Sequence, residues 1–208
     1  MELQFHGANC LTLNTKQARV TIDDNLAELG STPVLKANDI AIFTQQHSVP
    51  KEIPKLVVDG PGEYEVSGIS IQGMKVRSHI DTEQEKTGNL YKIQVDDLRL
   101  VVTGHIYPDL TDTQLETIGT VDILCIPVGG NGYTLDGEGA LKLIKKIEPK
   151  IVIPTHYADN SLKYPVAQQS LKEALESLGM EPKETLNKLK IKLADLSDVT
   201  QLIVLEKA

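Results

Sequence analysis

The hydrophobic pattern of the chain is clearest in an apolar stretch near its middle. Residues 121–128 form an almost unbroken apolar run, which ends at Gly129-Gly130. Such a run is typical of a strand that is buried on both faces, because a strand with one exposed face alternates apolar and polar residues. The pair of glycines then indicates a turn.

A helix and a second buried strand follow this turn. Asp136 can cap a helix in which apolar residues recur at helical spacing, and Pro149 ends it. The apolar residues 151–153 start a strand that ends at His156. Strand, helix and strand in this order predict a βαβ unit, in which exposed loops at the strand ends carry chemistry on a rigid sheet. His156 lies at one such end.

Shorter patterns predict the remaining elements. Apolar residues that alternate or cluster predict strands at 3–7, 10–15, 18–23, 39–44, 58–76, 89–93, 98–103 and 201–206. Residues 25–38 are predicted to form a loop. Thr111 and Gln114 predict a capping box for one short helix. Pro165 is predicted to open a final helix that ends at Gly179.

Length and charge limit the class of protein. With 208 residues, the chain is predicted to form a single domain, residues 1–208. Its net charge of −8 argues against binding to nucleic acid or to an anionic membrane surface. We find no apolar run of membrane-spanning length and no secretion signal in the first ten residues, so we expect a cytoplasmic protein. Cys10 and Cys125 lie in apolar contexts and are predicted to be buried free thiols.

Four segments together resemble a known family. They are VDILCIPVGGNGYT at 121–134, PKIVIPTHY at 149–157, VDGPGEYEVSGISI at 58–71 and LTDTQLETIG at 110–119. The chain resembles the metallo-β-lactamase-fold hydrolases, in the branch of the ascorbate-6-phosphate lactonase-like proteins. The resemblance covers nearly the whole chain and implies an α/β fold, a four-layer αβ/βα sandwich of two mixed sheets flanked by helices.

The metal-binding motif of that family is substituted in this chain. The family carries His-x-His-x-Asp-His after the strand that corresponds to residues 39–44, and QQHSVP stands there at 45–50. Only His47 is retained. Glutamine is a poor zinc ligand, and Val49 and Pro50 offer no donor atom, so the second metal position of the family is lost.

Three further histidines stand at family ligand positions. His79 matches a metal ligand, His156 matches a histidine of the second metal, and His105 replaces the bridging aspartate. The resemblance therefore implies a cleft formed by His47, His79, His105 and His156, lined by Asp23 and Gln45, and flanked by Gly129, Gly130 and Tyr157. Three imidazoles and water would suit one zinc or another divalent ion. In a degenerate site, the histidines would instead bind one another and water, without metal.

Two hypotheses about function follow. The first is a single-metal hydrolase of an ester, a lactone or a phosphodiester, in which the metal activates water. The second is a catalytically inactive, metal-free homologue that acts as a binding or scaffold protein. Both imply a small-molecule ligand. Relatives with this fold often associate, so the resemblance also implies a possible homo-oligomer. Nucleic-acid processing is disfavoured by the acidic charge, and the name of the fold does not imply β-lactam hydrolysis.

Overall fold

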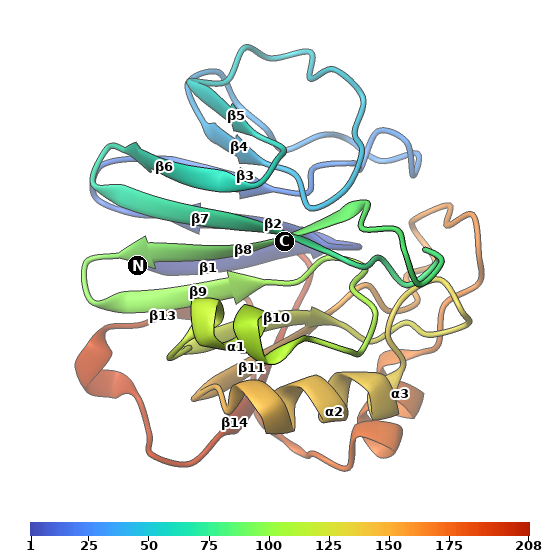
Figure 1. Cartoon of the computed structure of the whole chain (residues 1–208). Helices are drawn as coiled ribbons and strands as arrows, with labels where there is room; N and C mark the ends of the chain where they lie inside the picture. The colour runs from blue at the N-terminus through green and yellow to red at the C-terminus, as the bar shows by residue number, and fades with distance from the viewer.

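Two mixed β-sheets pack face to face in the computed structural model, which describes residues 1–208 (Figure 1). The six-stranded sheet has the order β13-β1-β2-β3-β4-β5, with β1 (Glu2–Gly7), β2 (Cys10–Asn14), β3 (Arg19–Ile22), β4 (Ile40–Ile42), β5 (Leu56–Val58) and β13 (Leu189–Lys190). The eight-stranded sheet has the order β12-β14-β11-β10-β9-β8-β7-β6, with β6 (Gly62–Val66), β7 (Ile69–Val76), β8 (Gly88–Val95), β9 (Leu98–Val102), β10 (Ile123–Pro127), β11 (Ile151–Thr155), β12 (Pro182–Leu186) and β14 (Gln201–Leu205). The predicted α/β class with two mixed sheets is confirmed.

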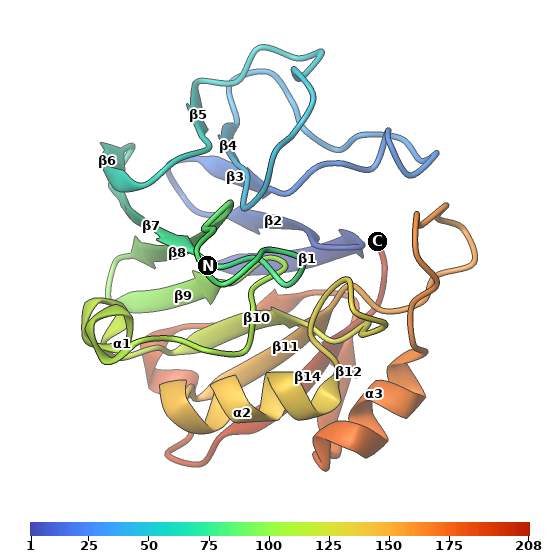
Figure 2. The same cartoon turned by 45° about the vertical axis from the view of Figure 1, so that its right-hand side comes forward.

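The helices lie on the outer side of the eight-stranded sheet (Figure 2). They are α1 (Asp112–Ile118), α2 (Gly137–Ile147) and α3 (Leu171–Leu178), and a short 3₁₀ helix follows at Leu193–Asp195. The predicted capping box of α1 is present, because Thr111 and Gln114 bond each other's backbone N–H groups. Asp136 caps α2 as predicted, accepting a hydrogen bond from Gly139 N at 2.8 Å.

The predicted start of α3 is wrong. Pro165 lies in an irregular segment, and the helix begins only after Ser170. Ser170 N donates to the Glu173 carboxylate at 2.8 Å, and Glu173 N donates to Ser170 Oγ at 3.2 Å. This capping box satisfies donors that the first helical turn leaves free. The Ser-x-x-Glu spacing was therefore the stronger start signal, while Gly179 ends the helix as predicted.

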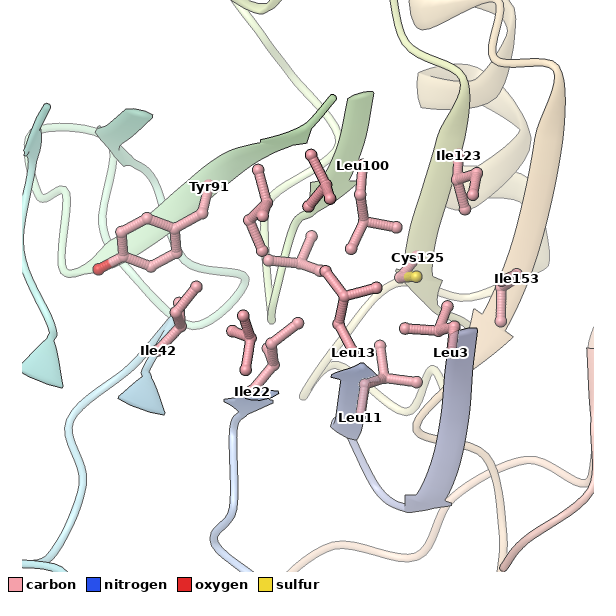
Figure 3. Close-up of a cluster of buried hydrophobic side chains, with 14 of the residues drawn as sticks. Leu3, Leu11, Leu13, Ile22, Ile42, Tyr91, Leu100, Ile123, Cys125 and Ile153 are labelled. Atoms are coloured by element: carbon pink, nitrogen blue, oxygen red, sulfur yellow. The ribbon is translucent and has the colours of Figure 1, made fainter. Parts of the chain in front are cut away.

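The main core fills the space between the two sheets. Figure 3 shows apolar side chains of the six-stranded sheet facing those of the eight-stranded sheet, namely Leu3, Leu11, Leu13, Ile22 and Ile42 on one side and Tyr91, Leu100, Ile123, Cys125 and Ile153 on the other. The intervening residues of β10, Leu124 and Ile126, pack instead with Leu143 of α2. The prediction that this strand is buried on both faces is confirmed.

The outer face of the six-stranded sheet is covered by irregular chain. Residues 24–38 contain no regular helix or strand, as predicted for 25–38. Leu26 packs with Cys10 of β2, and Leu35 packs with Ala41 of β4. Cys10 and Ala41 alternate with residues of the main core and so lie on the opposite face of the sheet. The helical layer therefore flanks one sheet, and this loop takes its place on the other.

Two predictions drawn from composition can be compared with the structure. Cys10 and Cys125 are both buried and unpaired, as predicted. None of the helices has the length and apolar character that a membrane span requires.

We expect Ile123→Ala to lower the free energy of unfolding by about 2–5 kcal/mol, because it leaves a cavity between close-packed sheets. Ile53→Ala is the matched control: Ile53 is 82% exposed, whereas Ile123 is 0% exposed. The control should change stability by less than about 0.5 kcal/mol. Urea unfolding of both variants measures this difference, and equal losses would contradict the assignment of the core.

Candidate functional site

A cavity of about 350 Å³ lies where strand ends of the two sheets meet. Parallel strands place their carboxyl ends at one edge of a sheet, and the chemistry of such sheets gathers there. The lining comes from the ends of β3, β4, β9 and β11, from the β1–β2 turn, and from three loops. It consists of Ala8, Asn9, Asp23, Asn25, Glu28, Leu29, Gln45, Gln46, His105, Tyr133, His156, Lys163, Tyr164 and Pro165.

Two histidines form the centre of this site. β9, β10 and β11 run parallel, so the chain leaves β9 toward His105 and leaves β11 at His156 on the same edge. The two rings meet edge to face, with centroids 4.4 Å apart and an interplanar angle of 85°. Tyr133 approaches the His105 ring at 4.8 Å, and Tyr164 approaches the His156 ring at 5.1 Å.

Burial keeps both imidazoles uncharged. His105 is 7% exposed and His156 is 4% exposed. Loss of hydration disfavours a charged ring, so burial lowers the pKa of His156 to about 4, against a smaller opposing effect of the Gln168 side chain. Burial also holds the pKa of His105 well below its usual range, and the neighbouring His156 and His79 add to this effect. Both rings are therefore neutral at pH 7.

The carboxylate of Asp23 is a structural part of the cavity wall. Thr44 N donates to Oδ1 and Thr44 Oγ1 donates to Oδ2, each at 2.6 Å. Burial raises the pKa of Asp23 to about 6, although these hydrogen bonds and the charge of His47 act in the opposite direction. Both oxygens are engaged by Thr44, so Asp23 links β3 to the segment that follows β4.

A glycine allows the His105 loop to approach Thr44. Gly104 has a φ of +56°, and a Cβ at this position would lie 2.2 Å from Thr44 Oγ1. Any larger residue would collide with Thr44 and would also adopt a left-handed backbone conformation that side chains disfavour. Gly104 therefore determines how closely His105 can lie to the end of β4.

The structure places the two other predicted ligands outside the cavity lining. The His47 ring stacks on Phe43 with centroids 3.6 Å apart, and its Nε2 lies 3.4 Å from Asp59 Oδ2. His79 donates its backbone N–H to His105 O at 2.7 Å, while its ring lies 5.8 Å from that of Tyr107. Both histidines thus lie beside the site, near enough for His79 to act on the pKa of His105, but neither lines the cavity with the His105–His156 pair.

The predicted cleft-lining residues also divide into two groups. Asp23 and Gln45 line the cavity. Gly129 and Gly130 do not line it and support the loop behind His156 instead, since a Cβ at Gly129 would lie 2.1 Å from His156 O. Tyr157 points into the core, where its ring meets Phe5 at 5.5 Å and its hydroxyl donates to Leu205 O at 3.4 Å.

Several residues of the site were not predicted. Tyr133 comes from the glycine-rich turn after β10, and Lys163 and Tyr164 come from the loop between β11 and α3. The Tyr164 hydroxyl donates to Tyr157 O at 3.0 Å, which folds this loop over the site. The only sequence signal was the glycine-rich turn, because nothing in the spacing of residues 158–170 indicates that they return to the cavity.

The donor atoms present do not fit a three-ligand metal centre. A catalytic zinc site uses three protein ligands and a water molecule. The cavity brings together two imidazoles, and the structure contains no group of three or more His, Cys, Asp or Glu side chains arranged to hold a metal ion. Gln45 and Gln46, which also line the cavity, offer amide groups that bind zinc poorly.

Two face-to-face mixed sheets with a site at the strand ends match solved structures of the metallo-β-lactamase fold, although irregular chain stands where the expected four-layer sandwich has its second helical layer. A metallo-beta-lactamase superfamily protein from Thermotoga maritima has a similar structure, with a TM-score of 0.78 and 21% identity over 99% of this chain and 98% of that chain. Igni18, a metallo hydrolase from Ignicoccus hospitalis, has a TM-score of 0.63 and 15% identity over 99% and 95% of the two chains. At these identities the likeness concerns the fold.

The sequence profile described as "Beta-lactamase superfamily domain" matches residues 2–156, about three quarters of the chain. The protein therefore belongs to the metallo-β-lactamase superfamily. It is similar to a UPF0173 metal-dependent hydrolase of Thermoplasma acidophilum, with 29% identity over 57% of this chain and 53% of that protein. A UPF0173 metal-dependent hydrolase of Carboxydothermus hydrogenoformans is 49% identical over 43 residues, 21% of this chain and 19% of that protein. The matches thus span about half of these relatives or less.

We expect Asp23→Asn to flatten the pH dependence of stability. Between the ordinary pKa of 3.8 and about 6, folded Asp23 keeps a proton that the unfolded chain has lost. The free energy of unfolding therefore falls as the pH rises through this window, by about 3 kcal/mol in all. The variant lacks this contribution, so the wild type should lose most of that amount, about 2 kcal/mol, relative to the variant between pH 4 and pH 7.

Urea unfolding at pH 4, 5, 6 and 7 measures this difference. The matched control is Asp97→Asn, because Asp97 is exposed and forms no salt bridge. Curves for wild type and Asp23→Asn that run parallel across the window would show that ionisation of Asp23 carries no such cost.

Proposed function

We propose that this protein is a hydrolase of a small, uncharged ester or lactone, and that the cavity holding His105 and His156 is its reaction site. The observation that carries the proposal is the pair of neutral imidazoles at the strand ends, in a cavity large enough for a small molecule. Membership of the superfamily supports it, as do relatives named metal-dependent hydrolases.

The charges around the cavity favour a neutral substrate. Three lining side chains carry charge, namely the acidic Asp23 and Glu28 and the basic Lys163. With Asp23 ionised, their sum is −1. A phosphodiester anion would meet no surplus of positive charge, whereas a neutral carbonyl compound would meet no repulsion. The remaining polar lining groups are amides, imidazoles and phenol hydroxyls, which suit an uncharged ligand rich in hydrogen-bonding groups.

The side chains of the cavity supply the parts of a general-base reaction. In this mechanism, a ring nitrogen of His156 takes a proton from water as the water oxygen attacks the carbonyl carbon. The carbon–oxygen bond to the leaving group then breaks, and the proton passes to the departing alkoxide. Thr155 Oγ1 donates to Asn9 Oδ1 at 2.9 Å, which leaves the Asn9 amide nitrogen as a donor for the developing oxyanion.

The low pKa of His156 limits the substrates further. A base with a pKa of about 4 takes a proton weakly at neutral pH. The reaction is therefore restricted to carbonyl groups that water attacks easily, such as those of strained lactones and aryl esters. No step is assigned to a metal ion, because the donor set does not fit one.

A second candidate function is a metal-free binding protein that retains the cavity without turnover. The observation in its favour is the same shortage of ligands, since the structure offers two imidazoles where a metallohydrolase needs three ligands. Both candidate functions require the cavity to bind a small molecule, and they differ in whether a bound ester is cleaved.

Hydrolysis assays distinguish the two candidates. We expect cleavage of 4-nitrophenyl acetate and δ-valerolactone, and none of bis(4-nitrophenyl) phosphate. His156→Ala should lower kcat/KM for the first two by about 10²-fold or more, the usual contribution of a general base. His6→Ala is the control, because His6 bonds Thr12 at 2.9 Å and lies outside the cavity lining. Binding of δ-valerolactone without turnover would favour the binding protein.

Metal analysis tests the donor set directly. We expect far less than one zinc, manganese or iron ion per chain after zinc or manganese loading and dialysis, because two imidazoles hold a divalent ion weakly. Inductively coupled plasma mass spectrometry measures this content. One metal per chain that is retained in wild type and lost in His156→Ala would instead establish a single-metal hydrolase.

A further inference from the structure

Gln168 contacts the back of the His156 ring from outside the cavity lining. Its Oε1 lies 3.1 Å from His156 Nδ1. Its amide nitrogen donates to Val166 O at 2.6 Å, and this second bond determines which way the amide points. A carbonyl oxygen accepts hydrogen bonds and cannot donate, so Nε2 must face Val166 O and Oε1 must face the imidazole.

This orientation determines the tautomer of His156. Oε1 can only accept, so the neutral ring carries its hydrogen on Nδ1 and a lone pair on Nε2. Nε2 makes no hydrogen bond within the protein, and the surrounding residues do not enclose it. Since His156 lines the cavity, its available polar atom is a hydrogen-bond acceptor.

The backbone holds Gln168 in this position. Gln169 N donates to Gly129 O, and Ala158 N donates to Gln169 O, each at 2.8 Å. The Gln168 side chain then passes directly over Gly129, where a Cβ would lie 2.1 Å from Gln168 Oε1. His156 itself has a φ of +51°, a strained conformation that its backbone bond to Ala8 O at 2.7 Å helps to hold.

We propose that Gln168 is a positioning residue that fixes His156 as the Nδ1–H tautomer, so that the cavity accepts a hydrogen bond from its ligand or from water at His156 Nε2. This inference rests on the proposed function only for the identity of the bound group, a water or a hydroxyl. The tautomer is a property of the free protein. It also makes Nε2 the nitrogen that takes the proton in hydrolysis.

Histidine ring nitrogens give separate NMR signals, which test the tautomer without any substrate. We expect two-bond ¹H–¹⁵N correlation spectra of ¹⁵N-labelled full-length protein at pH 7.5 to show a protonated Nδ1 and an unprotonated Nε2 for His156. The His156→Gln variant identifies the signals. Gln168→Leu, which has no acceptor, should abolish the preference for Nδ1–H. Gln168→Glu should keep it, because a carboxylate oxygen still accepts from Nδ1–H although it can no longer donate to Val166 O.

The matched control is Gln17→Leu, because Gln17 is exposed in the turn between β2 and β3 and does not line the cavity. An Nε2–H tautomer in the wild type, or an unchanged Nδ1–H tautomer in a folded Gln168→Leu variant, would overturn the proposal. If Gln168→Leu fails to fold, the wild-type spectrum and that of Gln168→Glu still decide it.

Rates of ester hydrolysis test whether Gln168 also affects activity. We expect Gln168→Leu to lower kcat/KM for 4-nitrophenyl acetate by about 10-fold or more, and Gln168→Glu to restore most of this loss. A wild type that shows the Nδ1–H tautomer and hydrolyses none of the esters would refute the proposed hydrolase while supporting the role of Gln168. A wild type that hydrolyses the esters but carries the Nε2–H tautomer would support the proposed hydrolase and refute the role of Gln168.

Discussion

The candidate site depends on the hydrogen bonds through which Thr44 joins the two sheets. Thr44 follows β4 of the six-stranded sheet and donates both its N–H and its hydroxyl to Asp23. Its carbonyl accepts from Asn89 N, which belongs to β8 of the eight-stranded sheet, at 2.8 Å. Buried backbone groups without partners are costly, so these bonds hold the strand ends of both sheets against each other. Gly104 completes this arrangement by leaving room for Thr44.

Burial behind this junction determines the chemistry of the histidine pair. Two imidazoles whose centroids are 4.4 Å apart would repel each other if both were charged, and their burial already disfavours either charge. The neutral rings of His105 and His156 therefore offer a ligand hydrogen-bond donors and acceptors, whereas a metal centre would offer it a positive charge. That difference explains why we place neutral carbonyl compounds before phosphodiesters, although the fold also occurs in proteins named for metals.

Most elements of the fold could be predicted because their signals are local. The apolar run 121–128, the Asp136 cap and the Thr111–Gln114 box each concern residues a few positions apart. The predicted start of α3 at Pro165 is wrong because the chain before Ser170 is held out of the helix by distant groups such as Gly129 O. The cover of the outer face of the six-stranded sheet by a loop, in place of helices, likewise depends on contacts such as that of Leu35 with Ala41.

The sequence by itself determined the class of fold and the strand ends at which His105 and His156 stand, because these follow from residue type and local spacing. Only the tertiary structure decided which histidines meet. His47 turns to Phe43 and Asp59, and Tyr157 turns into the core, through contacts with no fixed sequence separation. The same holds for Gln168, whose role depends on a side chain that crosses Gly129 to reach a ring twelve residues earlier in the chain.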